Sequence, residues 1–149
     1  MEITNYFTSS SKEHWKKEIG RAVWGAAKFL LQMLNENSVE KHIGKDAKLF
    51  LLTDGTKLVS FCTLAEKDEI EAPGLKPWIG FVFTFPEYRG NHYAGKLIAH
   101  ACKTASEMGE NVIYISTDAT GLYEKYGFTF QCIMDSIWGE KARVYKKVL

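Results

Sequence analysis

The stretch from Phe85 to Lys96 carries the residues best suited to binding an anion. It joins an expected strand to an expected helix and contains two glycines, a small alanine and the basic side chains Arg89 and Lys96. The first amides of a helix have no partner within the helix, and together with the helix dipole they favour an anion. Glycine and alanine let a phosphate approach that backbone closely. The stretch predicts a pyrophosphate site, and an ordinary glycine-containing helix start is the alternative.

A second set of side chains could bind an amine. Four acids stand within the six residues from Glu66 to Glu71, and two tryptophans, Trp78 and Trp138, lie further along the chain. Carboxylates next to aromatic rings could hold a cationic, partly apolar amine. The alternative is a solvated acidic loop, because charge runs usually face water.

The elements of the first half are expected from local patterns. Residues 3–7 suggest a short strand, and Ser10 with Glu13 fits the capping box that begins a helix. Apolar residues from Val23 to Leu34 recur on one helical face. Asp54-Gly55 predicts a tight turn between strands over 47–53 and 57–65.

The second half predicts a strand–helix–strand unit followed by a closing hairpin. We expect strands over 78–85 and 111–116 around a helix that ends near Met108, then a short helix over 122–126 stopped by Gly127, then strands over 128–134 and 143–148. A strand–helix–strand crossover requires a parallel pair. The fold class is therefore mixed α/β, with a mostly antiparallel central sheet and helices on both faces.

Composition limits the function classes. The chain has 149 residues, which fits a single domain over 1–149, and a formal net charge of +1 favours neither nucleic acid nor an anionic membrane as the partner. Cys62, Cys102 and Cys132 stand at no metal-ligand spacing, so we expect no metal site and three buried thiols. No signal peptide or membrane span is apparent, and we expect a cytoplasmic protein.

Two motifs resemble the GNAT superfamily of acetyl-CoA-dependent N-acetyltransferases. Its turn pattern Q/R-x-x-G-x-G/A, often preceded by Pro-Glu-Tyr, is similar to the run from Pro86 through Arg89 to Ala94. His92 stands where the first glycine is usual, so either the turn needs no positive φ there or His92 tolerates it. The family segment A-x-x-L-Y-E-K-x-G-F is similar to residues 119–128, although Ser116 stands where many members have Asn.

The resemblance implies a fold, a co-substrate and a set of site residues. Acetyl-CoA would lie in a V-shaped split between the two parallel strands, and Tyr123 would protonate the departing thiolate. The general base stays open between Asp118, which could instead cap a helix, and a water chain to Glu69 or Glu71. Acceptor contacts are expected from Trp78, Asp118 and Trp138. The residues expected to hold the co-substrate are Val82, Phe83, Thr84, Arg89, Gly90, Asn91, His92, Tyr93, Ala94, Gly95 and Lys96.

The function expected from this resemblance is transfer of the acetyl group of acetyl-CoA to a primary amine in a ternary complex. The acceptor would be a small molecule or a peptide, and the enzyme a monomer or a homodimer. One alternative is a catalytically silent module that binds or senses acyl-CoA on the same fold. The other is an interaction domain without a co-substrate, against which the anion-binding turn argues.

Overall fold

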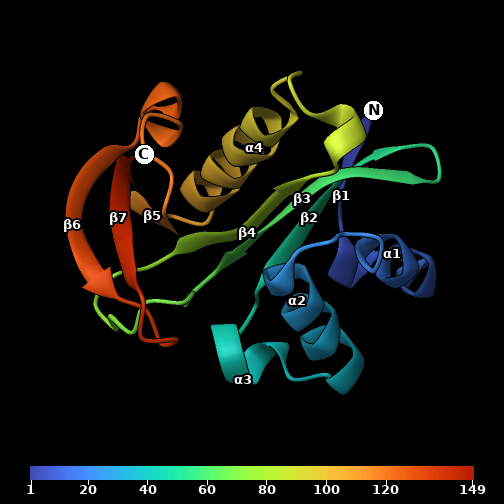
Figure 1. Ribbon diagram of the computed structural model, residues 1–149, viewed down its shortest axis with the longest axis horizontal. Coiled ribbons are helices and arrows are strands. Elements are labelled where there is room, and N and C mark those ends of the chain that lie inside the picture. The colour runs from blue at the N-terminus through green and yellow to red at the C-terminus, as the bar shows by residue number, and fades with distance from the viewer.

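The computed structural model describes residues 1–149 and contains one seven-stranded sheet (Figure 1). The strand order is β1-β2-β3-β4-β5-β7-β6, and every neighbouring pair is antiparallel except β4 with β5. This confirms the mixed, mostly antiparallel sheet. The strands are β1 Glu2–Asn5, β2 Lys48–Asp54, β3 Lys57–Ala65, β4 Trp78–Thr84, β5 Val112–Thr117, β6 Thr129–Asp135 and β7 Lys141–Val148.

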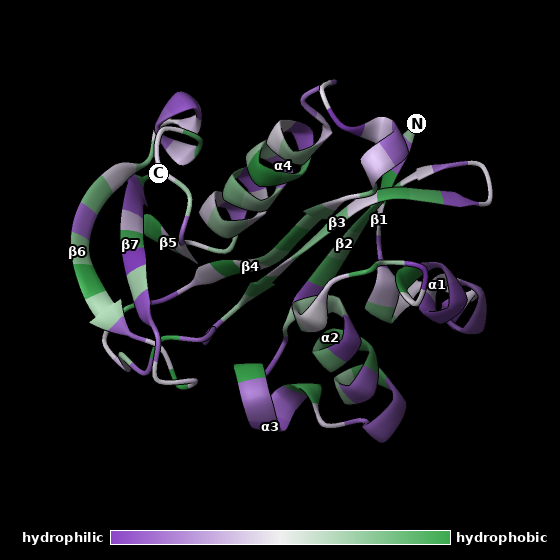
Figure 2. Cartoon of the chain, in the orientation of Figure 1, coloured by the Kyte–Doolittle hydropathy of each residue, from purple (hydrophilic) through white to green (hydrophobic).

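Helices cover both faces of the sheet, as expected. Helix α4, Tyr93–Glu107, lies on one face, while α1, Lys12–Ile19, α2, Gly25–Glu36, and α3, Val39–Ile43, lie on the other (Figure 1). None of these helices is both long and apolar enough to cross a membrane. Each face has its own buried cluster, with Leu97 and Ala101 of α4 in one and Leu30 and Met33 of α2 in the other. Figure 2 shows hydrophobic residues along the central strands between these layers.

The parallel pair is short, and its two strands then separate. Strands β4 and β5 pair only at Trp78 with Tyr114 and at Ile79 with Ile115. From Gly80 onward, β4 remains paired with β3 on one edge and has no strand partner on the other. The structure therefore contains the split expected between the parallel strands, with its apex at Ile79 and Ile115.

A bulge in β4 lies just beyond this apex. The register with β3 shifts between the pairs Phe61–Phe83 and Thr63–Gly80, and Phe81 has a φ of 50°. A bulge bends its strand and increases the local twist. The distortion begins where β4 loses its pairing with β5, which is consistent with the bulge turning β4 away from its neighbour.

Several local expectations need correction. Val23 precedes α2 and is 95% exposed, and Ser11, without a side-chain hydrogen bond, caps α1 in place of Ser10. Helix α3 was not expected, because its five residues are too few to show a period. Cys132 is exposed, since it lies on the edge strand β6, whereas the other two cysteines are buried.

Candidate active site

The split opens into a cavity of about 710 Å³. Its floor comes from the separating strands, with Ile79 to Val82 on β4 and Ile115 to Thr117 on β5. Its walls come from the start of α2, the end of α3, the loop after β3 and the loop between β6 and β7. The volume is in the range of small-molecule sites.

Asp68 lies at the apex of the split against the backbone of Gly80. Gly80 is the first residue of β4 after the last pair with β5. A Cβ added there would stand only 2.9 Å from the Asp68 Cγ and still closer to its Oδ1. Any side chain at position 80 would thus displace the carboxyl group, so glycine is needed for this close approach.

The environment of Asp68 makes it a weaker acid than usual. Burial raises the pKa of Asp68 to about 7, with a further contribution from the Glu69 carboxylate, while the Glu69 backbone N–H donates a hydrogen bond that opposes the shift. The residue as a whole is intermediate in exposure and lines the cavity, so Asp68 can be reached from that side although its carboxyl group is largely removed from water. A carboxyl group with a pKa near neutrality can accept and release a proton at physiological pH.

The loop after β3 is held by contacts from distant parts of the chain. Glu69 accepts a hydrogen bond from Ser116 Oγ at 2.7 Å, and its carbonyl accepts one from the Ile137 amide at 2.8 Å. Ile70 forms a bridge with Ser136. Asp68 and Glu69 consequently line the cavity, whereas Glu71 is exposed and does not. The solvated-loop interpretation is wrong for these two acids.

Tyr123 lines the same cavity from the 3₁₀ helix Tyr123–Tyr126. It is 6% exposed, and its ring packs against Phe128 and Tyr145. Burial, followed by the nearby Cys62, Tyr126 and Asp68, raises the pKa of Tyr123 to about 12. Its phenol therefore stays protonated at neutral pH, in a cavity that Asp68 also lines.

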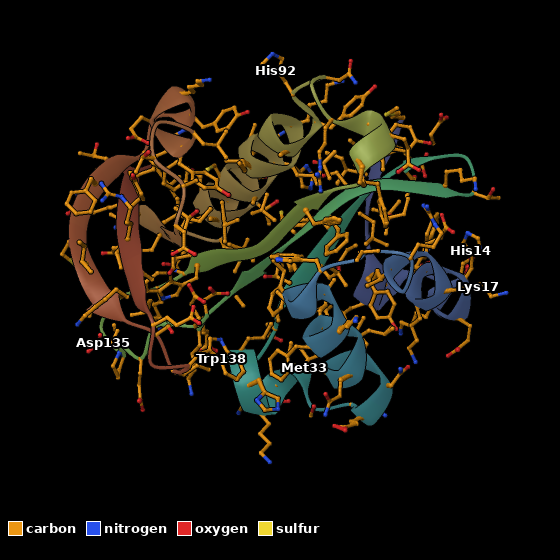
Figure 3. The ribbon with its side chains drawn as sticks, in the orientation of Figure 1. His14, Lys17, Met33, His92, Asp135 and Trp138 are labelled. Carbon is orange, nitrogen blue, oxygen red and sulfur yellow. The ribbon has the colours of Figure 1, made fainter.

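The start of α4 has the properties expected of an anion site. The first helical hydrogen bond runs from Lys96 N to His92 O, so the amides of Tyr93, Ala94 and Gly95 have no backbone acceptor. His92 adopts φ 58° and ψ 28°, and its side chain does not cap the helix. His92 thus tolerates the left-handed conformation that the turn requires. Figure 3 shows His92 at the outer end of α4.

Other residues of this turn have roles that the sequence did not reveal. Arg89 folds back, so that its Nε donates to the Thr84 carbonyl at 2.9 Å and its guanidinium lies over the Phe83 ring. A Cβ on Gly95 would meet the Tyr126 ring at 2.7 Å, so Gly95 makes room for a packed side chain while its amide stays free. Gly90, Asn91 and Lys96 are exposed, and Phe83 is buried.

The three expected acceptor residues divide between the cavity and the core. Asp118 and Trp138 line the cavity, and Figure 3 shows Trp138 beside α2 and α3, on the opposite side of the sheet from His92. Trp78 is a correction, because it is 1% exposed, packs on Tyr114 and donates its Nε1–H to the Leu75 carbonyl. It does not line the cavity.

Several lining residues were not predicted from the sequence. Asp68 was counted among the four acids but not as a base, since no local pattern distinguishes the acid that faces inward. Trp24, Phe29 and His42 were missed because they come from α2, its preceding loop and α3, far from the motifs. The site combines a carboxyl group titrating near neutrality, a protonated phenol and, beyond the cavity, a helix end with three free amides.

Comparisons with known proteins agree with the fold. The family model described as "Acetyltransferase (GNAT) family" matches residues 34–128, well over half of the chain. A comparison with curated protein sequences finds no match.

Solved structures of acetyltransferases share the fold. An aminoglycoside 6'-acetyltransferase type Ii is 16% identical, with a TM-score of 0.72 over 99% of this chain and 97% of the other. An aminoglycoside 6'-N-acetyltransferase complexed with coenzyme A is 14% identical, with a TM-score of 0.68 over 99% of this chain and 97% of the other. A GNAT family acetyltransferase from Elizabethkingia anophelis with acetyl-CoA bound is 13% identical, with a TM-score of 0.70 over 99% of this chain and 97% of the other.

The contact between Asp68 and Gly80 predicts an unusual titration. In a carbon-13 NMR titration, the Asp68 carboxyl of the wild type should titrate near pH 7. Gly80→Ala should move that midpoint toward the reference value of about 3.9, because the new methyl forces the carboxyl toward solvent. Gly25→Ala is the matched control, since Gly25 also lines the cavity but has no atom near its added Cβ. A wild-type midpoint near 4 would contradict the site geometry.

Proposed function

Because the chain belongs to the GNAT acetyltransferase family, we propose that it transfers the acetyl group of acetyl-CoA to the primary amine of a small-molecule or peptide acceptor. Acetyl-CoA is the co-substrate of this reaction and supplies the acetyl group as a thioester. Both substrates would be bound together, and the amine would attack directly. The observation that carries the proposal is the placement of Asp68 and Tyr123 in one cavity at the apex of the split.

The residues around the split fit the co-substrate. The free amides of Tyr93, Ala94 and Gly95 would bind its pyrophosphate, with no acid in the first turn of α4 to repel it. Exposed Lys96 adds positive charge nearby. The unpaired edge of β4 near Val82 would pair with the amides of the pantetheine arm. The Thr84 carbonyl already accepts one hydrogen bond from Arg89 Nε, which leaves one lone pair for that pairing.

Asp68 is the proposed general base. An acceptor amine must lose a proton when its nitrogen attacks the thioester carbon, and Asp68 would take that proton. A pKa of about 7 places Asp68 between its protonated and ionised forms at the working pH, where general bases are most effective. Glu69 is less suited to this role because its Oε1 already accepts the Ser116 hydroxyl.

Tyr123 is the proposed hydrogen-bond donor to the departing sulfur. The carbon–sulfur bond breaks with its electron pair going to sulfur, and the phenol would donate to the charge that develops there. A phenol with a pKa of about 12 does not fully transfer its proton to a thiolate whose conjugate acid has a reference pKa near ~8.5. The contribution of Tyr123 to the rate should therefore be modest.

Coenzyme A should stabilise the fold through the start of α4. At a hundredfold excess over its dissociation constant, it should raise the free energy of unfolding by about 2.7 kcal/mol. Ala94→Val should weaken coenzyme A about tenfold or more but leave pantetheine affinity unchanged, because its added methyls stand beside the free amides. Calorimetric titration measures both affinities.

The matched control is Ala99→Val, which makes the same change at an exposed position further along the same helix. It should bind coenzyme A like the wild type. A melting temperature that saturating coenzyme A leaves unchanged would remove the co-substrate assignment.

Tyr123→Phe keeps the packed ring and removes only the donor. Its turnover number should fall by up to roughly 100-fold, the lower end of general-acid effects, while acetyl-CoA affinity stays close to that of the wild type. Tyr126→Phe, the same change at a position that does not line the cavity, should retain its turnover number. Full activity of Tyr123→Phe, with chemistry shown to limit the rate, would exclude this role and favour a silent acyl-CoA-binding module.

A further inference from the structure

We propose, on the basis of the function above, that the acceptor is a monocationic amine on a flat aromatic body, an arylalkylamine, and not a polyhydroxylated polycation. The cavity carries the signature of such a ligand in two parts. Its wall opposite β5 is aromatic, and its apex is acidic.

The aromatic part is centred on Phe29 of α2. Its ring centroid lies 5.5 Å from that of Trp138, 5.2 Å from that of His42 and 6.5 Å from that of Phe81. These rings come from α2, α3, β4 and the loop between β6 and β7, and all four line the cavity. Offset and edge-on arrangements at these distances leave ring faces and edges available to a further aromatic group.

Part of this wall is exposed although it is apolar. Trp138 is 59% exposed, Ile137 56% and Trp24 37%, and all three line the cavity. Such side chains gain free energy when a ligand covers them, at roughly 25 cal/mol for each Å² of apolar surface removed from water. Clustered exposed apolar groups around a concave surface are typical of a ligand site.

The charged part of the cavity selects a cation. Asp68, Glu69 and Asp118 line the cavity, and neither lysine nor arginine does. Glu69 is held by the Ser116 hydroxyl and Asp118 is exposed, whereas Asp68 lies at the apex against Gly80. One primary amine directed at Asp68 satisfies this arrangement.

A polyol with several ammonium groups would leave hydroxyls unpaired along the aromatic part of this cavity. Phe29, Phe81 and the ring face of Trp138 offer no hydrogen-bond partner there, and most of the polar lining residues lie on the other walls. Polar groups that lose water without gaining a partner cost free energy on binding. The aromatic wall therefore disfavours a polyol in proportion to its number of hydroxyls, whereas it favours a planar apolar group.

Calorimetric titration at pH 7.5, with and without coenzyme A, tests this inference directly. The probes are 2-phenylethylamine, n-butylamine and kanamycin. We expect 2-phenylethylamine to bind at least tenfold more tightly than either of the others. Trp138→Ala should reduce the preference for 2-phenylethylamine over n-butylamine about tenfold, because the substitution removes the ring that the phenyl group of the ligand would cover. Ile133→Ala removes a similarly exposed apolar side chain outside the cavity, and this variant should keep the wild-type preference for 2-phenylethylamine over n-butylamine.

The outcomes distinguish a failure of the proposed acceptor class from a failure of the proposed acetyl transfer. Tighter binding of kanamycin, no measurable binding of 2-phenylethylamine, or an unchanged preference in Trp138→Ala would overturn the acceptor class. The same samples are then supplied with acetyl-CoA and the released thiol is measured. Preferential binding of 2-phenylethylamine without acetyl transfer would overturn the proposed function while the assignment of the cavity to an arylalkylamine stands.

Discussion

The separation of β4 from β5 after only two residue pairs is the constraint on which the rest of the site depends. It leaves one edge of β4 unpaired, opens the cavity and exposes the backbone of Gly80 to Asp68. The bulge at Phe81 accompanies this separation, since its positive φ and the register shift lie just beyond the last pair. A continuous parallel pair would close both the unpaired edge of β4 and the apex.

Asp68 illustrates how a functional group can reduce the stability of the fold that holds it. Its pKa is about 7 in the folded chain and near 3.8 when unperturbed, so between these values the folded state binds more protons than the unfolded state. Asp68 therefore lowers the free energy of unfolding progressively as the pH rises from about 3.8 to about 7, and this loss is reversed as the pH falls. The bridge between Ile70 and Ser136 and the hydrogen bond from Ser116 to Glu69 hold the loop in place against this effect.

Local signals allowed much of the fold and the free amides at the start of α4 to be predicted from the sequence. The Asp54-Gly55 turn, the stop at Gly127 and the free amides before Lys96 each depend on neighbours in the chain. The acceptor half could not be predicted in this way. Whether Asp68 or Glu71 faces the cavity depends on contacts with residues 136–137, and the aromatic wall is assembled from four separate elements. Trp78, which looked suitable by type, is buried in the core.

The central claim, that Asp68 takes the proton from the acceptor amine, is tested by the pH dependence of the turnover number. The measurement compares the wild type with Asp68→Asn between pH 5.5 and 8.5, using saturating acetyl-CoA and a primary amine, with Glu71→Gln as the exposed control. Taking the ratio of the two rates cancels the titration of the amine itself. We expect a ratio that rises with pH and levels off above about pH 7, at roughly 100-fold or more. A ratio near one, or one that does not change with pH, would contradict it.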